Sequence, residues 1–153
     1  VAHNNLGVAH QRAGRAEIAV KHYQTALLSG AQGAEVLNNL GLAEQDLGRM
    51  ASAEKSFLRA IDLQPYDVRP KINLSVLRGR KSGKNTLEIY EEISKTYWNS
   101  VEVWRILAAE WSRISEYPKA LYAYNRILEI DPGDEFAIAK KSYLKSLIMG
   151  SSD

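Results

Sequence analysis

Three asparagines recur at a constant spacing of 34 residues, at Asn5, Asn39 and Asn73. Asn4 and Asn38 precede the first two. Asparagine is a poor residue for a helix interior, so its return at one phase of a repeat calls for a reason. A carboxamide offers N–H donors and an acceptor, which matches a backbone amide whatever side chains flank it. The asparagines are therefore candidates for binding the main chain of a peptide.

The three histidines, His3, His10 and His22, give no comparable site. The seven residues from His3 to His10 span about 10 Å of helix. No cysteine or carboxylate stands beside them at the spacing of metal ligands. We interpret His10 as a core or half-core residue and predict no metal, no cofactor and no enzyme activity.

The stretch 79–85, GRKSGKN, invites a phosphate-loop interpretation. Its glycines are separated by three residues where that loop has four, and Asn85 replaces the Ser or Thr that would bind magnesium. We interpret it as a turn between helices. Residues 69–87 nevertheless contain six Lys and Arg residues and no acidic side chain. Such a cluster could bind phosphates or an acidic segment, although it has no aromatic residue to stack a base, so nucleic acid is disfavoured. The alternative is a solvated turn.

The bulk composition is that of a soluble globular protein. Hydrophobic residues make up 45% of the chain and charged residues 25%, and 20 Lys and Arg oppose 18 Asp and Glu. The absence of cysteine excludes a disulfide framework. No run of 18 apolar residues exists to span a membrane, which favours a soluble protein of the cytoplasm. The chain begins inside a repeat, so we expect it to be a piece of a longer one.

The elements that position the asparagines repeat along the chain, and residues 37–65 illustrate the pattern. Its apolar residues recur at helical spacing in two runs, Leu37, Leu40, Ala43 and Leu47, then Ala53, Phe57, Ala60 and Ile61. Gly48 separates the runs, because glycine readily takes the positive φ that ends a helix. Pro65 follows the second run. Each unit is predicted to be a helix hairpin, with Gly41 where the two helices approach closely.

The Leu40–Gly41 pair, the Ala-x-x-x-aromatic-x-x-Ala run from Ala53 and the closing Pro65 resemble the tetratricopeptide repeat family. Residues 101–134 carry the fullest version, with Trp104, Leu107, Ala108, Trp111, Ala120, Tyr124 and Pro132. The resemblance implies an all-α, right-handed α-α superhelix, or solenoid, of helix hairpins. We expect one array over residues 1–148, with repeats at about 1–33, 34–67, 68–100 and 101–134, a capping helix at 135–148 and a tail at 149–153.

Two departures from the pattern carry their own expectations. In the third repeat Ser75 replaces the glycine and one residue is missing near 82–84, so we expect a kink there. In the segment 135–148 the apolar face is predicted to contain Phe136, Ala139, Tyr143, Leu144 and Leu147. The alternative for this segment is the first half of a truncated fifth repeat.

In this family the first helices of successive repeats line a concave groove, and the resemblance implies that the asparagine position points into it. We therefore expect a non-catalytic protein–protein interaction module that binds an extended or helical peptide. Three asparagine hydrogen bonds contribute about 2–4 kcal/mol. Association costs at least about 4 kcal/mol, so apolar or charged contacts must supply the rest of the binding free energy. The predicted groove residues are Asn4, Asn5, Asn38, Asn39, Asn73, Val8, Leu42, Val76, Arg69, Arg80 and Arg113.

Alternatives remain for each part of this prediction. Asparagine is frequent at this position across the family, and Val8, Leu42 and Val76 could instead serve ordinary helix packing. The chain could be a structural or self-association scaffold that forms homo-oligomers, or a repeat region attached to a catalytic domain outside this chain. Trp98 and Tyr122 lack a core role and are predicted to be exposed contacts for a partner or a second copy.

Overall fold

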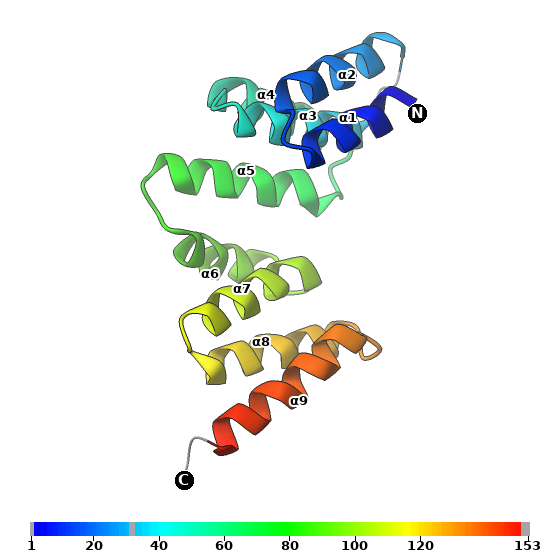
Figure 1. Cartoon of the computed structure of the whole chain (residues 1–153). Helices are drawn as coiled ribbons and strands as arrows, with labels where there is room; N and C mark the ends of the chain where they lie inside the picture. The colour runs from blue at the N-terminus through cyan, green and yellow to red at the C-terminus, as the bar shows by residue number, and fades with distance from the viewer. Residues whose placement is uncertain (1, 31–32, 151–153) are drawn as a thin grey trace. The chain divides into compact units, whose positions relative to one another are not determined.

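The computed structural model describes residues 2–30 and 33–150. Within those ranges the chain forms nine α-helices and no strand (Figure 1). The first five are α1 (Ala2–Arg12), α2 (Ala16–Leu28), α3 (Ala34–Asp46), α4 (Met50–Leu63) and α5 (Val68–Lys81). The remaining four are α6 (Thr86–Thr96), α7 (Val101–Arg113), α8 (Tyr117–Ile130) and α9 (Glu135–Gly150). The all-α class predicted from the sequence is confirmed.

The chain divides into two compact units, residues 1–82 and 83–153. The boundary falls in the third predicted repeat, which has Ser75 in place of glycine and lacks one residue near 82–84. That the repeats form a single array, kinked at this point, stays a prediction.

In the first unit, α1 pairs with α2 and α3 pairs with α4, while α5 packs on α4. The first helices of successive repeats also meet, α1 with α3 and α3 with α5. One buried cluster joins α2 to α3 around Tyr23, and another joins α4 to α5 around Phe57. Both rings are fully buried. These contacts hold α1, α3 and α5 next to one another and so bring the asparagine positions together.

Helix ends in this unit follow the predicted chemistry. Gly48 has a φ of +73°, and its N–H donates to the carbonyl of Gln45 after α3 ends. Asp67 caps α5 by accepting from the N–H of Arg69 at 3.0 Å. Ala31 and Gln32, which precede α3 in the sequence, lie outside the described residues.

In the second unit, α7 pairs with α8, α6 packs on α7, and α9 packs on α8. Asn85 caps α6 in a reciprocal pair with Glu88. The predicted turn is confirmed for residues 82–85 only, because residues 79–81 continue helix α5. Trp104, Trp111 and Tyr124 are buried, as the repeat pattern predicts. No helix in the described ranges is long and apolar enough to cross a lipid bilayer.

The buried face of α9 differs from the one predicted. Ala137 and Leu144 are buried, whereas Phe136, Ala139 and Tyr143 are exposed. At the start of the helix, Asp134 caps α9 by accepting from the N–H of Ala137 at 2.9 Å and pairs with Arg105 of α7, which ties this end of α9 to α7. The buried face is set by the packing of α9 on α8. The helix runs to Gly150, two residues past its predicted end, and residues 151–153 lie outside the described part.

Candidate functional site

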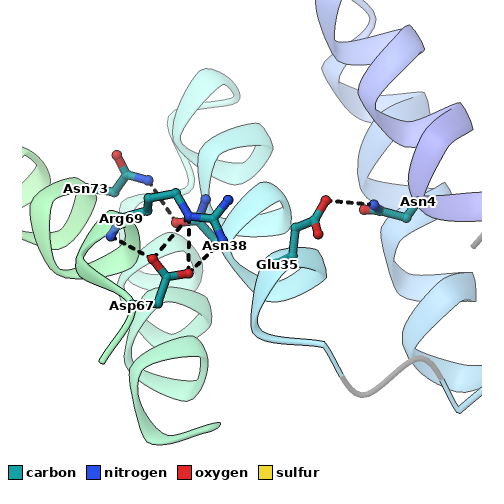
Figure 2. Close-up of polar contacts among 6 residues, drawn as sticks. All are labelled: Asn4, Glu35, Asn38, Asp67, Arg69 and Asn73. Atoms are coloured by element: carbon teal, nitrogen blue, oxygen red, sulfur yellow. Dashed lines mark hydrogen bonds and ion pairs between the residues drawn. The ribbon is translucent and has the colours of Figure 1, made fainter. Parts of the chain in front are cut away.

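The candidate site is the surface of the first unit where α1, α3 and α5 present their asparagines. Asn73 Nδ2 donates to Asn38 Oδ1 at 2.8 Å, and Asn39 Nδ2 donates to Asn4 Oδ1 at 3.3 Å. Figure 2 shows the Asn38–Asn73 bond between α3 and α5. Each bond links residues 35 positions apart, so an asparagine of one repeat holds the neighbouring asparagine of the next. We call these four residues, together with Asn5, the amide strip.

Charged groups extend the strip at the α1–α3 junction. Asn4 Nδ2 donates to Glu35 Oε1 at 3.3 Å (Figure 2). Gln11 Nε2 donates to Asp46 Oδ2 at 3.0 Å, again between residues 35 positions apart. The α1–α3 side of the strip therefore carries two carboxylates that accept from neutral amides.

Arginine stands on the α5 side. The Arg69 guanidinium donates to both oxygens of Asp67, with Nη2 to Oδ2 at 2.8 Å (Figure 2). Hydrogen bonding from the Arg69 side chain, with its backbone N–H, holds the pKa of Asp67 below its ordinary value. The Arg69 side chain is 54% exposed. The pair thus keeps a cation at the solvent side of the start of α5.

The carboxamides of the strip retain hydrogen-bonding capacity. Each has two N–H donors and a carbonyl oxygen, and Asn39 and Asn73 use one N–H each in the bonds between repeats. Both side chains are half-buried, and Asn5 is exposed. Asn38 is buried, so it serves mainly to orient Asn73.

The predicted apolar residues lie deeper. Val8 and Leu42 are half-buried and pack against the clusters around Tyr23 and Phe57, and Val76 is buried. This is the packing role that the sequence left open for them. Their contact with a peptide stays a prediction.

The remaining predicted cations have different surroundings. Arg80 is exposed in the last turn of α5. Arg113 belongs to α7 of the second unit, where it pairs with Glu110 at 2.8 Å. In the basic stretch, Arg78 pairs with Glu54 at 2.8 Å and Lys84 with Glu92 at 2.6 Å. Two cations of the basic stretch 69–87 are thus paired with carboxylates of the chain itself, although the sequence suggested that this stretch could bind phosphates.

The family model of the tetratricopeptide repeat matches residues 4–68. This range contains every residue of the amide strip except Asn73. Residues 4–68 carry tetratricopeptide repeats. The matched region covers the first two predicted repeats, and the helix pairing of the second unit has the same form.

Solved structures share this fold with the repeat chain. PilF of Pseudomonas aeruginosa is 23% identical, with 99% of this chain and 69% of that chain covered and a TM-score of 0.55. The MamA RS-1 ArsTM double mutant is 17% identical, with 99% and 96% covered and a TM-score of 0.54. MamA of AMB-1 is 15% identical, with 96% and 81% covered and a TM-score of 0.52. No curated protein matches the sequence.

The three histidines lie together in the structure, although His3 and His10 are seven residues apart in the sequence. The His22 ring of α2 stacks between those of α1, with centroids 5.5 Å from His3 and 5.2 Å from His10. His3 Nδ1 and His22 Nδ1 are 3.2 Å apart and share a hydrogen bond. All three are half-buried, as predicted for His10. In the described ranges, no group of three or more His, Cys, Asp or Glu is arranged to hold a metal ion.

Proposed function

We propose that the first unit is a non-catalytic protein–protein interaction module that binds an extended peptide segment along the amide strip. Asn5, Asn39 and Asn73 bind the main chain of that peptide. The tetratricopeptide repeats of residues 4–68 support the general role of the chain in protein interaction. The amide strip supports the finer assignment.

The observation that carries the proposal is the pair of bonds between repeats, Asn39 to Asn4 and Asn73 to Asn38. A free carboxamide on a helix surface samples several rotamers, and ordering it on binding costs free energy. Here the chain has already ordered two rungs while leaving each a second N–H and a carbonyl oxygen. Pre-organisation of this kind raises affinity because less ordering remains for the ligand to drive.

The spacing of the strip suits an extended chain. Neighbouring helices pack about 8–10 Å apart, and an extended peptide rises about 3.3 Å per residue. One rung should therefore meet about every third peptide residue. Specificity would come from charge, since Glu35 and Asp46 lie on α3 while Arg69 and Arg80 lie on α5. We expect a partner segment with a basic residue at its α3 end and an acidic residue at its α5 end.

Peptide display tests the proposal. Random twelve-residue peptides are selected on the immobilised chain, and the selected peptides are titrated calorimetrically. The variant Asn5→Ala/Asn39→Ala/Asn73→Ala should bind at least about tenfold more weakly, because three hydrogen bonds contribute about 2–4 kcal/mol together. The matched control is Gln24→Ala/Gln64→Ala, which removes two exposed carboxamides from outside the strip and should bind like the wild type.

The single variant Asn5→Ala separates binding from folding. Asn5 is exposed and makes no side-chain bond to α3, so its removal should weaken peptide binding several-fold without changing the unfolding midpoint. Equal affinity of the wild type and the folded triple variant would refute main-chain binding by the strip.

Self-association is the second candidate, and exposed apolar side chains of the second unit favour it. Ile138 is 50% exposed and Met149 is 76% exposed, both on α9. Sedimentation velocity over a range of concentrations distinguishes self-association from peptide binding by a monomer. A constant monomer mass excludes self-association, whereas a mass that rises with concentration and falls back in Ile138→Ser supports it.

A further inference from the structure

The second unit contains a pocket of about 470 Å³ lined by α6, α7 and α8. All three tryptophans of the chain line it, together with one tyrosine and two cations: Trp98, Trp104, Trp111, Tyr122, Lys95 and Arg126. The volume falls in the range of about 300–1,000 Å³ that small-ligand sites occupy. This pocket is separate in sequence from the amide strip and shares no residue with it.

The aromatic walls are held in place by specific contacts. Trp104 Nε1 donates to the carbonyl of Trp98 at 2.7 Å, which fixes the backbone of Trp98. The Trp104 ring meets Tyr122 edge-on, with centroids 5.8 Å apart and planes at 83°. Trp98 and Tyr122 nonetheless stay 58% and 53% exposed. Two large aromatic surfaces therefore face solvent at a concave site, which is the composition of an interface hot spot.

Two buried donors of this pocket lack an acceptor. Trp111 Nε1 is buried without a hydrogen-bond partner, in a residue only 7% exposed, and Arg126 Nε is likewise buried and unpartnered. Arg126 does pair through Nη1 with Glu129, and its guanidinium lies 5.7 Å from the centre of the Trp104 ring. Buried unpartnered donors are rare because they forfeit the hydrogen bonds water would give. Both donors belong to side chains that line the pocket.

At the equivalent place in the first unit, the buried polar side chains form a hydrogen bond with each other. Its pocket of about 560 Å³ contains Glu44, Ser56 and Arg59, which stand 67 residues before Trp111, Ala123 and Arg126. There the Ser56 hydroxyl donates to the buried Glu44 carboxylate at 2.7 Å. In the second unit, Trp111 and Ala123 replace this hydrogen-bonded pair. The buried acceptor has been lost and an aromatic donor stands in its place.

We propose that this aromatic pocket binds a segment of a partner protein that presents an aromatic side chain beside a carboxylate. The aromatic ring inserts between Trp98 and Tyr122, and the carboxylate lies toward Lys95 and Arg126. Charge selects the occupant: the residues that line the pocket include two cations, Lys95 and Arg126, against one carboxylate, Glu91. A carboxylate can accept hydrogen bonds from both cations at once.

Three blocked tripeptides test ligand chemistry: acetyl-Glu-Phe-Glu-amide, its charge-reversed form acetyl-Lys-Phe-Lys-amide, and acetyl-Glu-Ala-Glu-amide. The readout is the set of indole N–H resonances of ¹⁵N-labelled protein, because all three indoles line the pocket. The Glu-Phe-Glu peptide should shift the Trp98 and Trp111 resonances saturably. The other two should bind at least about fivefold more weakly, since each lacks one of the two interactions.

Variants place the binding in the pocket. Trp98→Ala and Tyr122→Ala remove exposed rings without opening the core and should weaken the Glu-Phe-Glu peptide about tenfold each. Tyr66→Ala is the matched control, because Tyr66 is 97% exposed and lies in the first unit. Its affinity should equal that of the wild type.

Three results would overturn the proposal. The first is indole resonances that do not move at millimolar Glu-Phe-Glu peptide, and the second is equal binding of the charge-reversed peptide. The third is a concentration-dependent dimer that Trp98→Ala abolishes, since the occupant would then be a second copy. The strip variant Asn5→Ala/Asn39→Ala/Asn73→Ala should bind the tripeptide normally, so the failure of one proposal leaves the other standing.

Discussion

Phe57 lies so close to Gly41 that a Cβ atom on Gly41 would stand 2.6 Å from Phe57 Cε1. The same contact occurs 34 residues earlier, where a Cβ on Gly7 would stand 2.4 Å from Tyr23 Cε1. Both rings are fully buried, and protein interiors are close-packed, so neither ring moves aside easily. The aromatic ring and the missing side chain together set how closely the two helices of each hairpin approach.

Gly41→Ala should therefore destabilise the first unit. Alanine favours a helix over glycine by about 1 kcal/mol, but overpacking a filled core costs about 1–3 kcal/mol. The steric cost should prevail, because the added carbon meets three atoms of an immobile ring. Urea unfolding followed by far-UV circular dichroism measures the change. Ser52→Ala, at an exposed site on α4, is the control and should be close to neutral. A stabilised Gly41→Ala protein would show that the helices can separate without cost.

At Gly48, in contrast, the cost of a substitution is expected to come from the backbone conformation and not from a lack of space. Nothing lies within 4 Å of a Cβ placed there, but φ is +73°. Gly48→Ala should cost about 1–2 kcal/mol, because an L-residue is strained at positive φ. Gly48→Asn should cost less, since asparagine tolerates this region. The order of the two unfolding midpoints is the measurement, and equal midpoints would contradict the conformational explanation.

The buried Ser56–Glu44 bond should be one of the stronger polar contacts of the first unit. Ser56→Ala leaves the Glu44 carboxylate buried without its donor, and a hydrogen bond to a charged group contributes about 1.5–3 kcal/mol. We expect a loss of that size by urea unfolding at neutral pH. A double-mutant cycle with Glu44→Gln isolates the pairwise part. Additive losses in the cycle would mean that the two side chains do not depend on each other.

Asp134 should make the stability of the second unit depend on acidity. The N–H of Ala137 foremost, and the Arg105 guanidinium, hold the pKa of Asp134 below its ordinary value of 3.8. The folded state thus favours the ionised form, so the contribution is complete above pH 3.8 and is lost as pH falls through the lowered pKa. Asp134→Asn should unfold at lower urea than the wild type at pH 7, and the gap should close on acidification.

Tryptophan fluorescence measures this gap specifically, because all three tryptophans belong to the second unit. Asp62→Asn is the control, since Asp62 is exposed in the first unit and should not alter the fluorescence transition. A gap that stays constant down to the acid transition would rule out Asp134 as its source.

The helix hairpins could be predicted from the sequence because they depend on local chemistry. Apolar residues at helical spacing place Phe57 and Ala60 on one face, and Gly48 and Pro65 stop the helices on either side. Gly41 could be placed at the close approach for the same reason, since the aromatic residue that needs the space recurs at a fixed distance from it. In the second unit, the burial of Trp104 and the exposure of Trp98 follow from their places in the repeat.

Contacts between repeats could not be predicted in this way. The asparagine spacing of 34 indicated a row of equivalent rungs, whereas the hydrogen bonds run between residues 35 apart and join unlike positions, such as Asn38 and Asn73. His3 and His10 were too far apart along one helix to meet, yet His22 enters between them from α2. In both cases the partner comes from another helix, and the sequence of one helix does not contain its position.

Sequence by itself determined the periodic helices, their ends and the small residues between them, because each depends on neighbours a few positions away. Only the tertiary structure decided which amides bond to one another, which face of α9 is buried and that three tryptophans share one pocket. These features depend on the rotation of one packed helix against the next. That rotation is set by many contacts at once, such as the ion pair of Asp134 with Arg105, and no single stretch of sequence specifies it.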